Sequence, residues 1–268
     1  MSILTNSQRE QFHTVGYLLA QDVISSDHVK DALKAIEEFA GLAIDDPTTW
    51  LLGDSENEGI VPLHHAQAFW NNRQYPKVHQ LFSELWGTEK LWVTMDRASF
   101  IPPRTMSRFP DPRLHWDLDP AKESGFVGGM LYLTDTPEER GAFRCAPQIY
   151  RSLEDWLNQQ SSNFDYQSAD LSEIPSIAIP GKAGDMVIWK PQLPHCAGVN
   201  LDCTPRATQY ISMYKAGNED DRQNAVSWWQ QKRPPVWWRD LPTQQDPEPG
   251  EPATLSALGR KLVGLDPW

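Results

Sequence analysis

Apolar residues recur at helical spacing in two stretches near the start of the chain. The first stripe runs through residues 26–40, and such a stripe is typical of a helix that buries one face. Gly41 can end this helix, because glycine readily adopts the left-handed conformation found at helix C-termini. A second stripe begins at Pro76, a residue favoured in the first turn, and Gly87 can close it. Two amphipathic helices are therefore expected.

A shorter helix and a strand are expected before them. Ser7 and Glu10 have the spacing of a capping box, which predicts a helix start at this point. Gly16 would follow that helix, and the apolar run 17–19 has the character of a strand. Residues 1–90 should thus form a largely helical N-terminal part.

From residue 91 the pattern changes to short runs rich in β-forming residues, separated by proline and glycine turns. These runs cover residues 91–95, 129–134, 176–179, 186–189 and 207–214. One helix is expected among them at 153–160. Many short strands without alternating helices favour a mainly β, antiparallel sandwich or barrel over a parallel sheet.

The C-terminal arm, residues 216–268, is rich in tryptophan and proline. Prolines and acids at 242–252 argue against regular structure there, whereas a short helix is expected at 255–262. The tryptophans have two interpretations: they pack the arm against the barrel, or they form an aromatic lid over a substrate entrance. The three parts, 1–90, 91–215 and 216–268, are expected to form one domain spanning 1–268.

Composition narrows the classes of partner. The formal net charge of −12 argues against nucleic acid or anionic lipid as a partner, although a small-molecule substrate remains compatible with it. No apolar run approaches the roughly 18 residues that a membrane span needs, so no membrane partner is expected. The three cysteines form no C-x-x-C pair, and the N-terminus shows no secretion signal. A cytoplasmic protein is expected, while its oligomeric state stays open.

His115, Asp117 and His195 are the candidate metal ligands. On a strand, residues two apart face the same side, so His115 and Asp117 could both reach one ion while Trp116 points away. His195 follows a Gly-Asp turn and a buried strand at 186–189, which would return it to the same end of the barrel. Two imidazoles and one carboxylate hold non-haem Fe(II) on one face. A lone H-x-D is common by chance, and a surface His and Asp pair is the simpler alternative.

Arg206 lies eleven residues after His195 and begins a strand with one polar face. Alternation places Arg206, Thr208 and Tyr210 on that face, opposite apolar residues such as Ala207. A buried guanidinium needs a counter-ion, and arginine grips a carboxylate through a bidentate fork. Arg206, with the hydroxyl of Thr208, is therefore a candidate clamp for a dicarboxylate. The alternative is an arginine at the rim that pairs with one of the many acids.

With these motifs in order, the chain resembles the phytanoyl-CoA dioxygenase family of Fe(II)/2-oxoglutarate oxygenases over about residues 91–214. The resemblance implies a double-stranded β-helix, a cupin-like jelly roll at 91–215, with flanking N-terminal helices. It implies Fe(II) on His115, Asp117 and His195, 2-oxoglutarate and O₂ as co-substrates, and Arg206 on the far carboxylate. Arg97, His64 and Tyr210 would line the substrate pocket.

Some positions depart from the family pattern. Ala197 stands where a hydroxyl residue is frequent, Ile101 where a lysine is common, and residues 147–150 replace a usual Pro-Gly-Ser-His. None of these belongs to the metal set, so the contacts to substrate and co-substrate are the ones expected to differ. The phytanoyl-CoA substrate is not transferred, because one fold serves many substrates.

The resemblance implies a dioxygenase that oxidises a small organic or natural-product molecule and releases succinate and CO₂. Hydroxylation is the favoured outcome because Asp117 is present, whereas related halogenases lack this carboxylate; desaturation and ring closure stay open. Two rival hypotheses are a non-catalytic cupin-like binding protein and a zinc hydrolase that uses the same ligands. Neither hypothesis explains why Arg206 is present.

Overall fold

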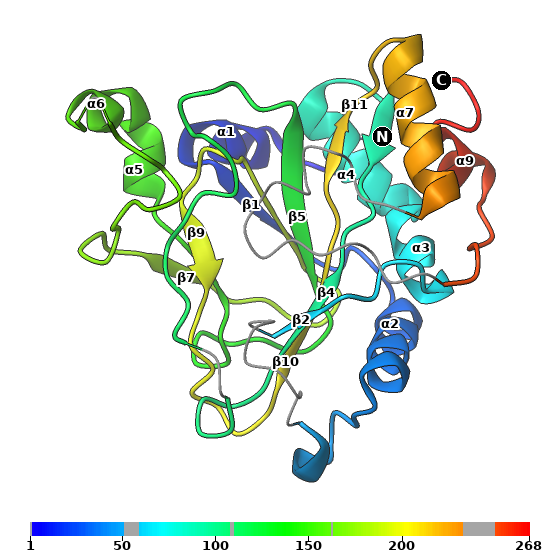
Figure 1. Ribbon diagram of the computed structural model, residues 1–268, viewed down its shortest axis with the longest axis horizontal. Helices are drawn as coiled ribbons and strands as arrows, with labels where there is room; N and C mark the ends of the chain where they lie inside the picture. Colours follow the sequence, from blue (N-terminus) through cyan, green and yellow to red (C-terminus); the bar gives the residue numbers. More distant parts are fainter. Residues whose placement is uncertain (1, 51–58, 108–109, 162, 233–249) are drawn as a thin grey trace.

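Two antiparallel sheets pack against each other in the computed structural model, which describes residues 2–50, 59–107, 110–161, 163–232 and 250–268 (Figure 1). The larger sheet has the order β1 (Tyr17–Ala20), β8 (Met186–Trp189), β5 (Phe126–Tyr132), β10 (Arg206–Tyr210), β4 (Ala98–Ile101) and β2 (Ile60–Val61). It is extended by β11 (Met213–Lys215), which pairs with both β5 and β3 (Leu91–Val93). The smaller sheet has the order β7 (Ile177–Ile179), β6 (Phe143–Cys145) and β9 (His195–Ala197). The expected mainly β sandwich is confirmed.

Side chains from both sheets meet in one apolar cluster, which marks the interior of the sandwich. Met130 and Tyr132 of β5 and Trp189 of β8 lie in this cluster with Phe143 and Cys145 of β6. Since neighbours along a strand face opposite sides, the alternate residues of β5 must point away from this interior. We call the cluster-facing side of the larger sheet its inner face.

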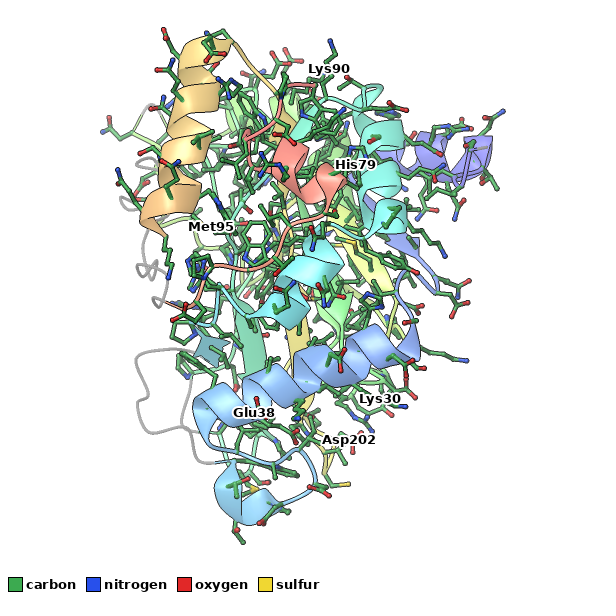
Figure 2. The ribbon with its side chains drawn as sticks, turned by 90° about the vertical axis from the view of Figure 1, so that its right-hand side faces the viewer. Lys30, Glu38, His79, Lys90, Met95 and Asp202 are labelled. Carbon is green, nitrogen blue, oxygen red and sulfur yellow. The ribbon has the colours of Figure 1, made fainter. Side chains whose placement is uncertain are left out.

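The outer face of the larger sheet is covered by helices, as Figure 2 shows from that side. They include α2 (Ser26–Ala40), α3 (Gln67–Arg73), α4 (Pro76–Trp86) and α9 (Ala257–Leu262). Val127 and Leu131 of β5 pack there with Phe82 of α4, in the larger of the core clusters. Gly41 and Gly87 end α2 and α4 in the left-handed conformation, as the sequence predicted.

The N-terminal helix α1 (Asn6–Val15) begins earlier than predicted. Its capping box is formed by Thr5 and Gln8, not by Ser7 and Glu10. The hydroxyl of Thr5 accepts a hydrogen bond from the Gln8 backbone, and the Gln8 side chain accepts one from the Thr5 backbone. Both pairs have the same spacing, and the Thr5 pair precedes the first turn, where the free backbone N–H groups need partners.

The C-terminal arm contains a helix that the sequence analysis missed, α7 (Glu219–Gln231), with a capping box between Asn218 and Asp221. Trp229 in this helix packs edge-to-face on Trp70, with ring centroids 4.6 Å apart. This contact agrees with the packing interpretation of the arm for that residue. The expected short C-terminal helix is confirmed as α9, whereas residues 233–249 lie outside the described part of the chain.

Three shorter helical segments complete the described elements: η1 (Pro47–Thr49), α5 (Pro147–Arg151) and α6 (Leu153–Asn158). The last confirms the helix expected at 153–160. Among the residues that the structure describes, no helix has the length and apolar character needed to cross a membrane.

Candidate metal centre

His195 opens β9 in the smaller sheet and points into the interior of the sandwich. His195 is 6% exposed. Its ring stacks on Phe143 with the ring centroids 5.5 Å apart, and it packs on Trp189 with the ring centroids 4.9 Å apart. Nδ1 lies 3.0 Å from the carbonyl oxygen of Leu193. A ring N–H that donates to this carbonyl leaves Nε2 unprotonated and free to bind a metal.

His115 lies beside His195, although the expected strand at His115–Asp117 is reduced to a single bridge. The two backbones exchange a pair of hydrogen bonds, each 3.0 Å long. The Nδ1 atom of His115 lies 2.9 Å from the carbonyl oxygen of Arg113, so this imidazole repeats the arrangement of His195. The local geometry still turns Trp116 away, into a separate apolar cluster with residues of α6.

Asp117 completes the candidate set. Its carboxylate oxygens lie 3.6 Å from Nε2 of His115 and 3.3 Å from Nε2 of His195. One ligand atom from each of the three residues falls within 4.8 Å of the others. Burial opposes ionisation of Asp117, but the charge and hydrogen bonds that the two imidazoles supply when no metal is bound and they are protonated outweigh it and hold its pKa well below its usual range. Two imidazoles whose Nε2 atoms lie beside an ionised carboxylate suit Fe(II).

Arg206 projects from the inner face of β10 in the larger sheet. It is 1% exposed, and one of its terminal nitrogens donates to the thioether of Met130 at 2.8 Å. Its Nε and Nη1 atoms have no hydrogen-bond partner among the described residues. The alternative of a rim arginine paired with an acid is therefore wrong. A buried cation left without an anion is costly, so the site fits a ligand carboxylate.

Thr208 lies two residues further along the same face of β10. It is fully buried, and its hydroxyl is 2.7 Å from the hydroxyl of Ser99 on the neighbouring strand β4. One of these hydroxyls must donate to the other, which leaves the second hydrogen for another acceptor. The pair thus adds a hydroxyl donor near Arg206, and Ser99 is a member that the sequence analysis did not single out.

The three candidate substrate residues come from neighbouring elements at one side of the larger sheet. The carbonyl oxygen of Arg97 accepts a hydrogen bond from the backbone of Tyr210 at 2.9 Å, which ties β4 to β10. His64 follows β2, the partner strand of β4, and is not itself on a strand. Burial, with help from the charges of Arg73 and Arg97, lowers the pKa of His64 to about 3, although its hydrogen bond to the Pro62 carbonyl opposes this.

Asp96 and Arg73 also belong to this region, and sequence reasoning missed both. Arg73, fully buried at the end of α3, donates to the backbone carbonyl oxygens of His64 and Asp96. Burial raises the pKa of the Asp96 carboxyl, and the nearby charge of Asp117 adds to this, whereas Arg97 and Arg73 oppose it. No local motif marks either residue, because their contact depends on the docking of α3 against the sheet.

Comparison with protein families gives a match over most of the chain. The model of the phytanoyl-CoA dioxygenase family matches residues 12–207 of this chain. A protein of Dictyostelium discoideum that is named for phytanoyl-CoA dioxygenase is 21% identical over 258 residues, covering 76% of this chain and 74% of its own.

Solved structures give the same fold. The chain is similar to the non-haem α-ketoglutarate-dependent carbocyclase SnoK of nogalamycin biosynthesis, with a TM-score of 0.57, 19% identity, and coverage of 93% of this chain and 95% of that one. It is also similar to the epimerase SnoN in complex with Fe³⁺, α-ketoglutarate and nogalamycin RO, with a TM-score of 0.58, 15% identity, and coverage of 94% and 96%. These matches confirm the double-stranded β-helix with flanking helices.

Proposed function

The chain belongs to the phytanoyl-CoA dioxygenase family, and we propose that it holds Fe(II) on His115, Asp117 and His195 and binds 2-oxoglutarate through Arg206. It is an Fe(II)- and 2-oxoglutarate-dependent oxygenase. The assignment of the individual residues rests on one observation above all. The guanidinium of Arg206 is buried without a carboxylate partner among the described residues, on the sheet opposite the one that carries His195.

The role of each ligand follows from its surroundings. The Leu193 and Arg113 carbonyls fix the two imidazoles with their Nε2 atoms toward Asp117. The low pKa of Asp117 keeps this carboxylate ionised and ready to bind a cation. Bound iron supplies the oxidative chemistry, in which 2-oxoglutarate, O₂ and a substrate C–H give succinate, CO₂ and a C–OH.

The 2-oxoglutarate end of the site uses Arg206 and Thr208. Arg206 offers the two unpartnered nitrogens to the far carboxylate, and the hydroxyl pair of Thr208 and Ser99 supplies a further donor. Binding of the dicarboxylate would then remove the cost of the isolated buried cation. A zinc hydrolase or a non-catalytic binding protein would leave these residues unexplained, because neither needs a dicarboxylate clamp.

Arg97, His64 and Tyr210 are proposed to line the substrate pocket. His64 would act as a neutral ring, because its pKa of about 3 lies far below neutral pH. It can therefore hydrogen-bond a substrate through its Nε2 atom, which has no partner among the described residues, but it cannot supply a positive charge. The substrate is proposed to be a small organic or natural-product molecule, and the favoured reaction is hydroxylation.

The whole chain is proposed to act as one oxygenase domain in the cytoplasm. All three cysteines are free thiols in the structure, and Cys145 and Cys196 are buried. A reducing compartment suits such a set, since it keeps unpaired thiols from cross-linking.

An anaerobic titration tests the proposed function. Protein with Fe(II) should bind 2-oxoglutarate and develop a weak visible charge-transfer band, and addition of O₂ should yield succinate. Metal analysis of the same sample separates iron from zinc. Absence of the band together with absence of 2-oxoglutarate affinity would overturn the assignment. Product mass then identifies the outcome, since hydroxylation adds one oxygen atom whereas desaturation or ring closure removes two hydrogens.

A further inference from the structure

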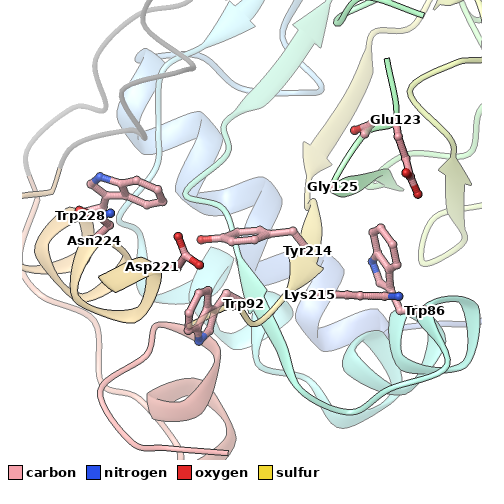
Figure 3. Close-up of a pocket in the computed structure, with 11 residues that line it drawn as sticks. Trp86, Trp92, Glu123, Gly125, Tyr214, Lys215, Asp221, Asn224 and Trp228 are labelled. Atoms are coloured by element: carbon pink, nitrogen blue, oxygen red, sulfur yellow. The ribbon is translucent and has the colours of Figure 1, made fainter. Parts of the chain in front are cut away.

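A groove of about 480 Å³ lies between α7, the segment 123–125 and the strands β3 and β11 (Figure 3). Its walls are largely aromatic: Trp86, Trp92, Tyr214 and Trp228 all line it. The rings of Trp92 and Tyr214 meet edge-to-face with centroids 5.9 Å apart. The volume falls within the range of about 300–1,000 Å³ that is usual for small-molecule sites.

The register of the strands relates this groove to the candidate metal centre. Tyr214 pairs with Phe126 at the start of β5, and Trp189 pairs with Gly128 two residues further on. Because residues two apart share a face, Phe126, Gly128 and Met130 all lie on the inner face. Tyr214 lies on this face as well, since Met213 packs in the outer core.

The inner face therefore carries two features in a row, and the groove lies beyond them at the end of the sheet. Arg206 contacts Met130 toward one end, and His195 rests on Trp189 beside Gly128. The aromatic groove lies at the end marked by Tyr214, where it also takes in Lys215 and Trp86 from the outer side of the sheet. The proposed 2-oxoglutarate anchor and the groove thus lie on opposite sides of the metal ligands along the sheet. A substrate held in the groove would approach the iron from the side away from Arg206.

The polar groups of the groove have mixed charge. Glu123 and Asp221 bring two carboxylates, whereas Lys215 brings one ammonium, which lies 5.1 Å from the ring centroid of Trp86. Asp221 already accepts a hydrogen bond from the Asn218 backbone in the α7 capping box, so the free charges of Glu123 and Lys215 largely offset each other. Asn224 adds an amide, so hydrogen-bond donors and acceptors both face the groove. Aromatic walls with such a lining favour a neutral ring that carries hydroxyl groups.

We propose that this groove binds a neutral, hydroxyl-bearing ring of the substrate, of the pyranose type, and so presents another part of the same molecule to the iron. The inference rests on the proposed function, because it treats the groove as an extension of the oxygenase site. The ring would stack on Trp228 or Tyr214, while Asn224 and the carboxylates of Glu123 and Asp221 bind its hydroxyls.

Saturation-transfer NMR on the full chain tests this proposal without turnover. The probes are methyl glucopyranoside, cyclohexylammonium and cyclohexanecarboxylate, which have six-membered rings of different charge. The glucoside should receive the strongest transfer, at its ring C–H protons. Stronger transfer to either charged probe, or no transfer to any of them, would overturn the proposal.

Variants locate the binding. Trp228→Ala should weaken glucoside binding about 3–10-fold through loss of a stacking partner. Asn224→Ala, at an exposed position of α7, should weaken it by a similar factor through loss of a hydrogen bond. Phe39→Ala removes an exposed ring from α2 and should leave binding unchanged. Unaltered binding in both groove variants contradicts the proposal. If Trp228→Ala proves poorly folded, unaltered binding in Asn224→Ala alone contradicts it.

The iron-dependent band distinguishes a failure of the groove assignment from a failure of the proposed function. Wild-type protein that shows the 2-oxoglutarate band but no glucoside binding disproves the groove assignment and leaves the oxygenase intact. Wild-type protein without the band contradicts the proposed function itself, whatever the probes do. The groove variants should retain the band, because neither residue belongs to the candidate iron or 2-oxoglutarate sites.

Discussion

The guanidinium of Arg206 donates to the thioether sulfur of Met130 at 2.8 Å. A thioether is a weak acceptor and carries no charge, so this contact compensates poorly for the burial of a cation. The remaining Nε and Nη1 atoms have no partner within the described residues. The protein therefore maintains a cation whose best partner is a ligand, and its stability and its ligand affinity should respond in opposite directions when that cation is removed.

We expect Arg206→Met to stabilise the protein in the absence of 2-oxoglutarate. Loss of an isolated buried charge should raise Tm by about 2–4 °C for each kcal/mol recovered. The same change should weaken 2-oxoglutarate binding by about 100-fold, because a charged hydrogen-bonded pair is lost. Differential scanning fluorimetry with and without 2-oxoglutarate measures both effects.

The control for this prediction is Arg104→Met. Arg104 is a half-exposed arginine that pairs with Asp111 at the surface, so its loss should change neither Tm nor 2-oxoglutarate binding appreciably. A lower Tm for Arg206→Met without ligand would indicate that Arg206 serves mainly to hold the fold.

Gly128 is expected to affect iron binding because the indole ring of Trp189 packs directly against it. A Cβ atom at this position would lie 2.8 Å from the indole of Trp189, which packs against His195. We expect Gly128→Ala to displace that ring and weaken iron binding several-fold, with the fold retained. Gly125→Ala is the matched control, since a Cβ there meets nothing within 4 Å. Iron titrations followed by the 2-oxoglutarate band compare the two, and equal affinities would contradict this role of Trp189.

The sequence predicted functional residues best where they alternate along a strand and so share one face. The polar face that begins with Arg206, Thr208 and Tyr210 could be predicted, because residues two apart share a side of a strand. The burial of Arg206 and its contact with Met130 could not, since they depend on how β10 and β5 pair. The contact of Arg73 with Asp96 was missed for the same reason. It joins a helix to a loop that no sequence spacing connects.

Local signals were also misplaced or overlooked. Two capping-box spacings lie close together at the N-terminus, and spacing alone does not decide between Thr5 and Ser7. The helix α7 was missed because its tryptophans were attributed to a tryptophan- and proline-rich arm. Its acidic first turn is in fact what a helix N-terminus favours, since it complements the helix dipole.

Asp117 should be essential for iron affinity, whereas Asp119, two residues further on, should not. Asp117→Ala removes the carboxylate that lies within 3.6 Å of both Nε2 atoms, and we expect it to abolish the 2-oxoglutarate band and succinate formation while Tm stays close to that of wild-type protein. Asp119→Ala is the control, because Asp119 pairs with Lys122 outside the candidate metal set. Equal loss in both variants would mean that the segment acts through its fold rather than through one ligand.

Glu84 should make the stability of the N-terminal segment depend on acid pH. Its carboxylate accepts hydrogen bonds from the backbone of Ile3 and Leu4 and pairs with Arg9 at 2.8 Å. Burial opposes ionisation, but the backbone and side-chain hydrogen bonds prevail and lower the pKa to about 2 from an ordinary 4.5. A depressed folded-state pKa stabilises the fold above the unfolded-state value, and this contribution is lost as pH falls from about 4.5 toward 2.

We therefore expect Glu84→Gln to cost about 1–2 kcal/mol in the free energy of unfolding at neutral pH, after allowance for solvent screening. The difference from wild-type protein should stay constant down to about pH 5 and then shrink, because the wild-type carboxylate becomes protonated only in the unfolded state over this range. Urea unfolding at a series of pH values measures it, with the exposed Glu10→Gln as control. A difference that persists unchanged to pH 2.5 would show that Glu84 stabilises the segment by packing rather than by charge.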